Sequence, residues 1–172
     1  MGSRTRFEAL FRDHAAAVRA YAARRAGLDD ADDVLAEVFL IAWRRLDDLP
    51  EDPLPWLLGV ARRVLANRRR GDVRRSAMHD RLIADAARTP QARALEATDG
   101  AVAAVLAKLG DRDREVLLLT AWEGLGHADA ARVLDIRTGT LTVRLHRARR
   151  RFAGLLAQAE SVPSTPTQME VL

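Results

Sequence analysis

A basic tract near the C-terminal end of the chain carries side chains suited to chemistry with nucleic acid. Residues 139–151 hold five arginines and one histidine. Apolar side chains recur along this tract with helical spacing, at Leu141, Leu145, Ala148 and Phe152. That spacing predicts an amphipathic helix whose basic groups lie mostly away from the core. Because arginine donates paired hydrogen bonds to phosphate and to guanine, the tract favours DNA binding.

The residues that precede this tract predict a helix-turn-helix unit. Residues 127–134 have the pattern of a short helix, and residues 135–137 are enough for a turn. A short helix followed by a basic helix is the layout of proteins that read the major groove of DNA. The alternative is an amphipathic helix whose arginines only face solvent, and the preceding helix and turn favour the DNA interpretation. The side chains expected to face the groove are Thr142, Val143, His146 and Arg147.

Positive charge is concentrated in two segments of the chain. Residues 61–100 carry a net charge of +5 and residues 144–172 a net charge of +3, whereas the whole chain carries +4. A basic surface confined to particular segments is typical of nucleic-acid contact. The general excess of arginine over lysine, with Lys108 as the only lysine, is better explained by a codon bias. The positions of the arginines along the chain are therefore the evidence for nucleic-acid contact, whereas their total number is not.

The first of these segments starts within a predicted helix over residues 55–70. Its basic end suits single-stranded or melted DNA, because bases stack on aromatic rings such as Trp56 while arginines follow the backbone. Trp56 also lies on the same apolar stripe as Val60 and Val64, which favours a place in the core. The arginines of this basic end are Arg62, Arg63, Arg68, Arg69, Arg70, Arg74 and Arg75.

An acidic cluster marks the start of another predicted helix. Four of the five residues 29–33 are aspartates, and Glu37 follows them. The cluster lacks the alternating ligand spacing and the glycine of a calcium loop. Acids in a first helical turn interact favourably with the helix dipole, and a partner with a basic surface is the better functional interpretation.

Other classes of function find no support in the sequence. The chain has no cysteine, its four histidines are scattered, and no phosphate-binding glycine loop or nucleophile elbow is present. We therefore expect no enzyme, no metal site and no cofactor. No apolar run reaches the roughly 18 residues of a membrane span, and the first residues lack the apolar core of a secretory signal. The expectation is a soluble, cytoplasmic protein without membrane insertion.

The elements that must position these residues are predicted to be helices throughout. Glycine and proline cluster at the predicted boundaries, and no segment alternates with a period of two. The fold class expected is all-α, with two small helical domains joined by a flexible linker. The expected organisation is an N-terminal helical bundle over residues 1–71, a linker over 72–98, a helix-turn-helix domain over 99–157 and a disordered tail over 158–172.

Several helix ends can also be predicted from residue type. Gly27 suits the end of the first helix, and either Asp29 or Asp30 suits the N-cap of the second. The third helix is expected to end before Gly71, where the apolar pattern weakens. Asp111 is expected to cap a helix of the second domain.

Taken together, two stretches of the chain resemble the extracytoplasmic-function (ECF) sigma factors, a group within the bacterial sigma-70 family. The resemblance covers about residues 7–70 and 101–156. Each motif alone is moderately specific, and all of them in this order in a short chain are strongly specific. The motifs are DADDVLAEVFLIAW from Asp30, PWLLGVARR from Pro55, LGDRDREVLLL from Leu109, EGL from Glu123 and GTLTVRLHRAR from Gly139.

The resemblance implies a sigma factor that binds core RNA polymerase and directs promoter-specific initiation. The second helix would dock on the clamp of the beta-prime subunit, and the C-terminal domain would contact the beta flap. The segment from the loop at residues 49–53 through the third helix would recognise and melt the minus-ten element. The C-terminal basic helix would read the minus-thirty-five element as duplex DNA. Many members of the family are held inactive by an anti-sigma factor, so we expect such a partner here.

This resemblance assigns three sets of site residues. The minus-thirty-five set is Thr140, Thr142, Val143, Arg144, His146, Arg147 and Arg150. The minus-ten set is Trp56, Arg62, Arg63, Arg69 and Arg70. The polymerase-binding set is Asp33, Glu37 and Leu40. The chain departs from the family pattern at Ala36, Gly126–His127, Ala130 and Thr142–Val143. At the last pair Lys-Ser is common, so we expect an altered minus-thirty-five preference.

Two other functions stay open on the residues alone. The first is a stand-alone helix-turn-helix regulator that binds duplex DNA as a dimer and needs no acidic docking helix. The second is an adaptor or anti-sigma-like protein whose helices bind only other proteins, against which the arginine clusters argue. Specific initiation after addition of the protein to core polymerase would separate all three.

Overall fold

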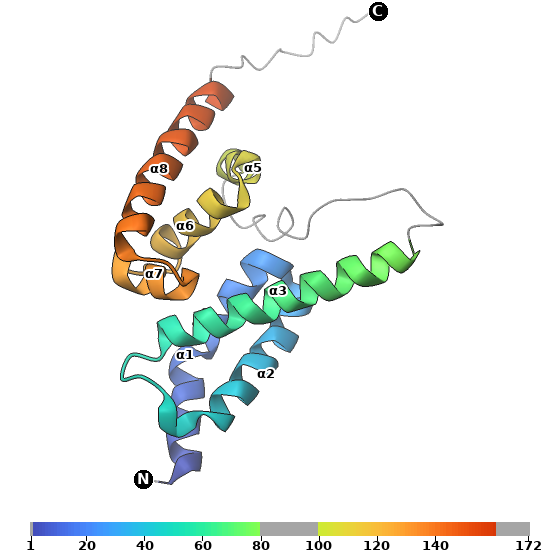
Figure 1. Ribbon diagram of the computed structural model, residues 1–172, viewed down its shortest axis with the longest axis vertical. Coiled ribbons are helices and arrows are strands. Elements are labelled where there is room, and N and C mark those ends of the chain that lie inside the picture. Colours follow the sequence, from blue (N-terminus) through green and yellow to red (C-terminus); the bar gives the residue numbers. More distant parts are fainter. Residues whose placement is uncertain (1, 80–99, 161–172) are drawn as a thin grey trace, which may run out of the picture.

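The structure is a computed structural model, and it describes residues 2–79 and 100–160 (Figure 1). Within these ranges every regular element is a helix, which confirms the predicted all-α class. The elements are α1 (Ser3–Ala26), α2 (Leu28–Arg44), a 3-10 turn η1 (Leu46–Asp48), α3 (Leu54–His79), α5 (Gly100–Lys108), α6 (Asp111–Ala121), α7 (His127–Leu134) and α8 (Thr138–Glu160). Helices α1–α3 form one small domain and helices α5–α8 the other.

The chain reverses direction between α1 and α2 at Gly27. Its φ of 93° lies in a region that only glycine adopts without strain, and its N–H donates to the carbonyl of Ala23 at 2.9 Å. This confirms the predicted end of the first helix. The prediction of an aspartate N-cap for α2 is wrong, because Gly27 itself occupies that position and no side chain caps the helix. Asp29 and Asp30 lie instead in the first turn.

Aromatic side chains join α1 to α2. Phe7 lies with its ring centroid 5.0 Å from Trp43 and 6.1 Å from Phe39, and Phe11 lies 4.8 Å from Phe39. All three pairs meet edge to face, which is a favoured geometry for aromatic rings. The buried side chains Val18, Val34, Val38, Leu57 and Val64 complete the centre of this domain.

Helix α3 is longer than the sequence predicted. It passes through Gly71 and is described as far as His79, so residues 72–79 are helical although they were expected to belong to the linker. A single glycine inside a helix costs only about 1 kcal/mol relative to alanine, and a long helix can bear that. The rest of the expected linker, residues 80–98, lies outside the described residues, as do residues 161–172 of the expected tail. The expected start of the tail at residue 158 is wrong, because α8 continues to Glu160.

The C-terminal domain contains the predicted helix-turn-helix unit. Helix α7 has the predicted bounds, and the turn that follows it places Asp135 in the left-handed region with a φ of 54°. Helix α8 then runs past α6 and α5 (Figure 1). The expected N-cap at Asp111 is wrong, since Gly110 holds the cap position and Asp111 is the first helical residue.

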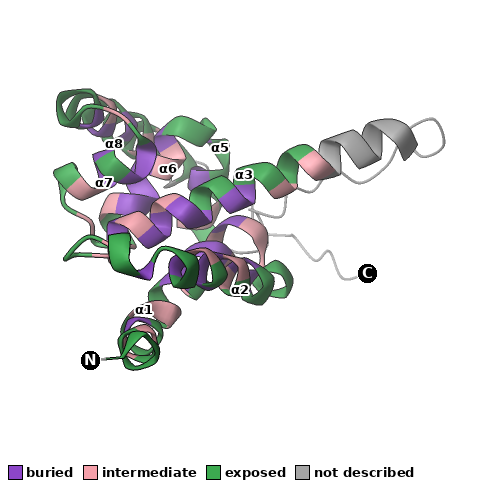
Figure 2. Ribbon diagram, turned by 60° about the horizontal axis from the view of Figure 1, so that its bottom comes forward, coloured by how far each residue is buried: buried purple, intermediate pink, exposed green. Residues whose placement is uncertain are grey.

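The two domains pack directly against each other. Helix α7 lies across α3, and buried side chains of both domains belong to one continuous apolar cluster (Figures 1 and 2). The contact is close at Gly59 of α3, where an added Cβ would lie 3.9 Å from the Cα of Val133 in α7. The domains therefore meet in a closed arrangement, in which the backbones of α3 and α7 approach each other at a residue without a side chain.

Candidate nucleic-acid interface

One face of α8 is exposed and carries most of the predicted groove-reading side chains. Leu141, Leu145 and Ala148 are buried on the opposite side, which confirms the predicted core face of this helix. Val143 is 53% exposed in spite of its apolar side chain. The exposed face comprises Thr140, Val143, His146, Arg147 and Arg150. These side chains lie where a helix-turn-helix protein presents its recognition helix to the major groove.

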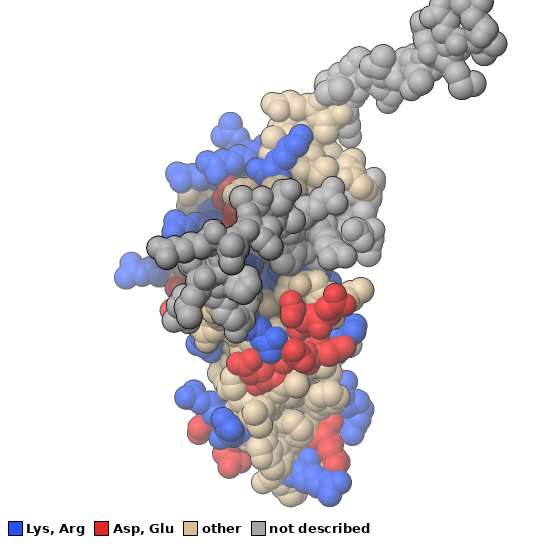
Figure 3. All heavy atoms as spheres, turned by 90° about the vertical axis from the view of Figure 1, so that its right-hand side faces the viewer, with Lys and Arg blue, Asp and Glu red and all other residues tan. Residues whose placement is uncertain are grey.

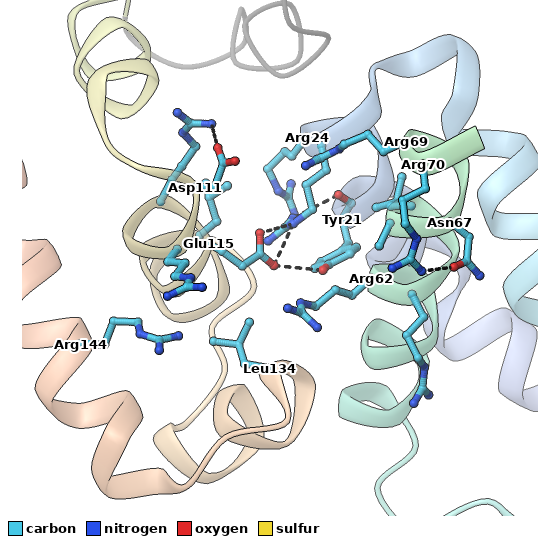
Figure 4. A pocket seen from close by; sticks show the side chains of 17 residues that line it. Tyr21, Arg24, Arg62, Asn67, Arg69, Arg70, Asp111, Glu115, Leu134 and Arg144 are labelled. Atoms are coloured by element: carbon cyan, nitrogen blue, oxygen red, sulfur yellow. Dashed lines mark hydrogen bonds and ion pairs between the residues drawn. The ribbon is translucent and has the colours of Figure 1, made fainter. Parts of the chain in front are cut away.

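The two remaining residues of the minus-thirty-five set lie at the edges of this face. The hydroxyl of Thr142 donates to the carbonyl of Thr138 at 3.1 Å and lies 3.3 Å from Nδ1 of His127 in α7. Arg144 is half-buried, and its side chain points toward the N-terminal domain (Figure 4). Thr142 thus joins the two helices of the unit, whereas Arg144 faces the other domain.

The arginines of the minus-ten set line a cavity between the two domains. Arg62, Arg63, Arg69 and Arg70 project from α3 into a space of about 540 Å³ whose other wall is built by α6, α7 and α8 (Figure 4). Trp56 is half-buried and packs against the apolar core, in agreement with its place on the stripe of Val60 and Val64. In the closed arrangement this basic side of α3 therefore faces the C-terminal domain.

The acidic side of α2 is exposed and remote from that cavity. Arg68 of α3 lies between two of its carboxylates, 3.6 Å from Oδ2 of Asp33 and 3.4 Å from Oε2 of Glu37. Leu40, one turn further along, is 50% exposed. Figure 3 shows acidic side chains gathered across the middle of one face of the molecule. The three residues predicted to bind polymerase thus share one helix face that combines negative charge with an exposed apolar side chain.

A neighbouring aspartate in the same cluster is held by the first helix. Nε of Arg19 lies 2.6 Å from Oδ1 of Asp32, and this hydrogen bond lowers the pKa of Asp32 below its ordinary value. Asp32 therefore joins α2 to α1, while Asp33 and Glu37 face outward.

Sequence reasoning missed the polar cluster that joins the two domains. Arg25 of α1 is only 5% exposed, and its Nε and Nη1 donate to Glu115 at 2.9 Å and to Glu123 at 2.9 Å. The hydroxyl of Tyr21 donates to Oε1 of Glu115 at 3.0 Å, and Arg24 also binds Glu123. No periodic pattern pairs residues 90 positions apart, as Arg25 and Glu115 are, so the sequence offered no signal for this contact.

Burial determines the protonation of this cluster. Removal from water raises the pKa of the Tyr21 hydroxyl well above its ordinary value, so the hydroxyl stays protonated and can donate to Glu115. Burial acts to lower the pKa of Arg25, but Tyr21, Glu115 and Glu123 more than offset it and raise the pKa. The guanidinium also lies over the Tyr21 ring, 3.6 Å from its centroid. The Tyr21 hydroxyl and the Arg25 guanidinium therefore both keep their protons near neutral pH.

The geometry defines an all-helical protein with a helix-turn-helix unit, and comparison with known proteins defines its family. The family model for sigma-70 region 2 matches residues 10–75, and the model for sigma-70 region 4 matches residues 99–152. The RNA polymerase sigma factor NccH of Alcaligenes xylosoxydans xylosoxydans is 31% identical over 92% of this chain and 91% of its own length. The ECF sigma factor SigL of Mycobacterium tuberculosis is 32% identical over 80% of this chain and 81% of its own.

Solved structures of sigma factors share the fold. The sigma factor RpoE of Bartonella quintana, in complex with the anti-sigma factor NepR, superposes with a TM-score of 0.69 at 23% identity over 88% of this chain and 96% of that chain. CnrH in complex with the cytosolic domain of CnrY superposes with a TM-score of 0.62 at 28% identity over 88% of each chain.

The chain belongs to the sigma-70 family, within its ECF group. Proteins of this family are the RNA polymerase sigma factors, which act in transcription initiation and are not enzymes themselves. Within the part of the chain that the structure describes, no helix combines the length and the apolar character that a membrane span needs.

Proposed function

We propose that this sigma factor binds core RNA polymerase through α2 and directs it to promoters through two DNA-reading surfaces. The exposed face of α8 reads the minus-thirty-five element, and the basic side of α3 engages the minus-ten element. The observation that carries the proposal is the spatial separation of two chemistries. An acidic face with an exposed leucine lies on α2, and a basic recognition face lies on α8. A regulator that binds DNA alone would need only the second.

The minus-thirty-five surface is supported by the exposure of its central residues. Arg147 and Arg150 are exposed and have no ion pair among the described residues, so both are available to bases or phosphates. Val143 lies on the same face, and an apolar side chain there can contact the methyl group of a thymine. The proposed reading surface is therefore mixed, with arginine for guanine or phosphate and valine for thymine.

The minus-ten surface requires the two domains to separate. The two promoter elements lie roughly 25 base pairs apart, or about 85 Å at about 3.4 Å per base pair. In the closed arrangement α7 lies against α3, so the two reading surfaces are adjacent. Both elements can be read together only after the domains move apart. We therefore propose that polymerase binding selects an open arrangement and exposes Arg62, Arg63, Arg69 and Arg70.

The proposed partners follow from these surfaces. Asp33, Glu37 and Leu40 bind the beta-prime clamp, and the C-terminal domain contacts the beta flap. The similar proteins RpoE and CnrH were solved with the anti-sigma factor NepR and with the cytosolic domain of CnrY, which supports an anti-sigma partner for this chain as well. The site of action is the cytoplasm, where core polymerase works.

A reconstituted transcription assay tests the proposal. The purified full chain is added to core polymerase with a set of promoter templates, and transcripts are mapped from their 5′ ends. Specific initiation that requires the chain supports the function. Tight binding to duplex DNA without polymerase, together with no initiation, would favour the stand-alone regulator instead.

A further inference from the structure

The cavity between the two domains has an excess of positive charge that the described residues do not balance. Nine arginines and two acids line it among the residues that the structure describes. Five of these arginines have no carboxylate within ion-pair distance among the described residues: Arg62, Arg63 and Arg69 of α3, Arg112 of α6 and Arg144 of α8. Guanidinium groups that converge without counter-charges repel one another, and the free energy of the closed arrangement falls when an anion joins them.

A buried donor adds to this imbalance. Arg25 also lines the cavity, and its Nη2 is buried without a hydrogen-bond partner in the part of the chain that the structure describes. The other nitrogens of that guanidinium already donate, Nε to Glu115 and Nη1 to Glu123 and to the carbonyl of Tyr21. An unsatisfied buried donor of this kind is costly, so it adds to the free-energy cost of the closed arrangement.

The size and position of the cavity favour a small ligand over DNA. Its volume of about 540 Å³ lies within the roughly 300–1,000 Å³ of small-molecule sites. Major-groove reading of duplex DNA requires an open helix face, whereas here the basic side of α3 is covered by the C-terminal domain. Figure 4 shows that side chains from both domains point into this space.

We propose that this interdomain cavity is a binding site for a small polyphosphate, which the five unpaired arginines hold from both domains. Arginine is suited to this role because its planar group donates two parallel hydrogen bonds to phosphate oxygens. The phosphate chain is the recognised group, whether it is free or carried by a nucleotide. A ligand that binds both walls stabilises the closed arrangement. Its effect on transcription rests on the proposed function, because Arg62, Arg63 and Arg69 are then withheld from the minus-ten element.

Isothermal titration of the full chain with sodium tripolyphosphate and with ATP, at matched ionic strength, tests the site. We expect saturable binding of one ligand per chain. Similar affinities for both ligands would show that the phosphate chain suffices, and tighter binding of ATP would identify a nucleotide as the ligand. Both of these outcomes support the proposal, and the absence of saturable binding of either ligand overturns it.

Variants in each wall of the cavity distinguish a specific binding site from non-specific attraction between opposite charges. We expect Arg63→Gln in α3 and Arg112→Gln in α6 each to weaken tripolyphosphate binding about tenfold or more, because each removes a charge-assisted contact. The matched control is Arg12→Gln in α1, an exposed arginine outside the cavity, for which we expect less than about a twofold change. Equal weakening by all three variants would show non-specific binding and overturn the proposal.

A third ligand, an acidic peptide, tests whether the cavity binds the carboxylates of a polypeptide instead of phosphates. An oligoglutamate peptide that binds more tightly than tripolyphosphate, and loses affinity in the same two variants, would assign the cavity to an acidic polypeptide and overturn the polyphosphate site. Thermal unfolding of each variant confirms that the fold is retained. Because no arm of the experiment contains DNA or polymerase, its result is independent of whether the chain initiates transcription.

Discussion

Arg25 of α1 binds Glu115 of α6 across the domain boundary, with Nε 2.9 Å from Oε2. The guanidinium is held at the same time by Glu123 and lies over the ring of Tyr21. A buried arginine without its carboxylates is strongly destabilising, so this cluster favours the closed arrangement only while all its members are present. The ion pair therefore specifies how the two domains pack against each other, and its loss is expected to weaken domain closure.

Glu115→Gln should loosen the closed arrangement. The change keeps the shape of the side chain but leaves a buried arginine with one charged partner fewer, which we expect to cost about 1–3 kcal/mol of closure free energy. Fluorescent labels on cysteines introduced at Glu8 and Gln158 would report the interdomain distance, since the chain has no cysteine of its own. The exposed control Glu51→Gln should leave the distance unchanged. An unchanged distance distribution in Glu115→Gln would contradict the role of the cluster.

Gly59→Leu should open the domains without harming α3. The first added carbon is tolerated, since a Cβ would lie 3.9 Å from the Cα of Val133, but the rest of a leucine side chain has to displace α7. Replacing a mid-helix glycine should itself favour the helix by about 1 kcal/mol. Gly59→Ala is the matched control and should remain closed. The same pair of fluorescent labels measures the interdomain distance in both variants. A distance that stays unchanged in Gly59→Leu would refute the close contact between α3 and α7 at this position.

Arg147→Ala should reduce promoter use with little loss of polymerase binding. The side chain is exposed on the recognition face of α8 and contributes no contact to the core, so the fold should be retained. Loss of one base or phosphate contact should cost about 1–3 kcal/mol of binding free energy, which corresponds to a roughly 5- to 150-fold lower promoter affinity. Run-off transcription and co-purification with core polymerase measure the two effects separately. An equal loss in both assays, or a similar loss in the control Arg12→Ala, would exclude this role.

Asp33→Arg should weaken polymerase binding itself. The substitution reverses a charge on the exposed face of α2 and places a second cation beside Arg68, which now lies 3.6 Å from the aspartate. We expect at least a tenfold loss of affinity for core polymerase, because like charges facing each other at an interface are unfavourable. The control Asp13→Arg makes the same charge change at an exposed position of α1. Unchanged co-purification of Asp33→Arg would count against the assignment of α2 as the docking helix.

Local features of the fold were predictable from the sequence because they depend on helical periodicity. The bounds of α7 and the buried side of α8 follow from the spacing of apolar residues such as Leu141 and Leu145. The N-caps of α2 and α6 were not predictable from residue type, since glycines took the positions expected for Asp29 or Asp30 and for Asp111. Several residue types are acceptable at an N-cap, so the chain path decides between them.

The way in which the two domains pack against each other could not be predicted from the sequence. The arginines of α3 were recognised as a basic cluster, but the cavity they line depends on the approach of α6, α7 and α8. That approach depends on a small residue at position 59 and on ion pairs between residues some 90 positions apart, as for Arg25 and Glu115. No local pattern encodes either contact, because both are properties of tertiary packing.

We propose that the chain turns core RNA polymerase into a promoter-specific enzyme through two DNA-reading surfaces. The most direct test is in vitro transcription with core polymerase on a promoter selected by the chain, with the minus-ten and minus-thirty-five elements altered one at a time. We predict specific transcripts that need the chain, and a loss when either element is altered. Transcription that is independent of the chain, or that ignores both elements, would contradict this account.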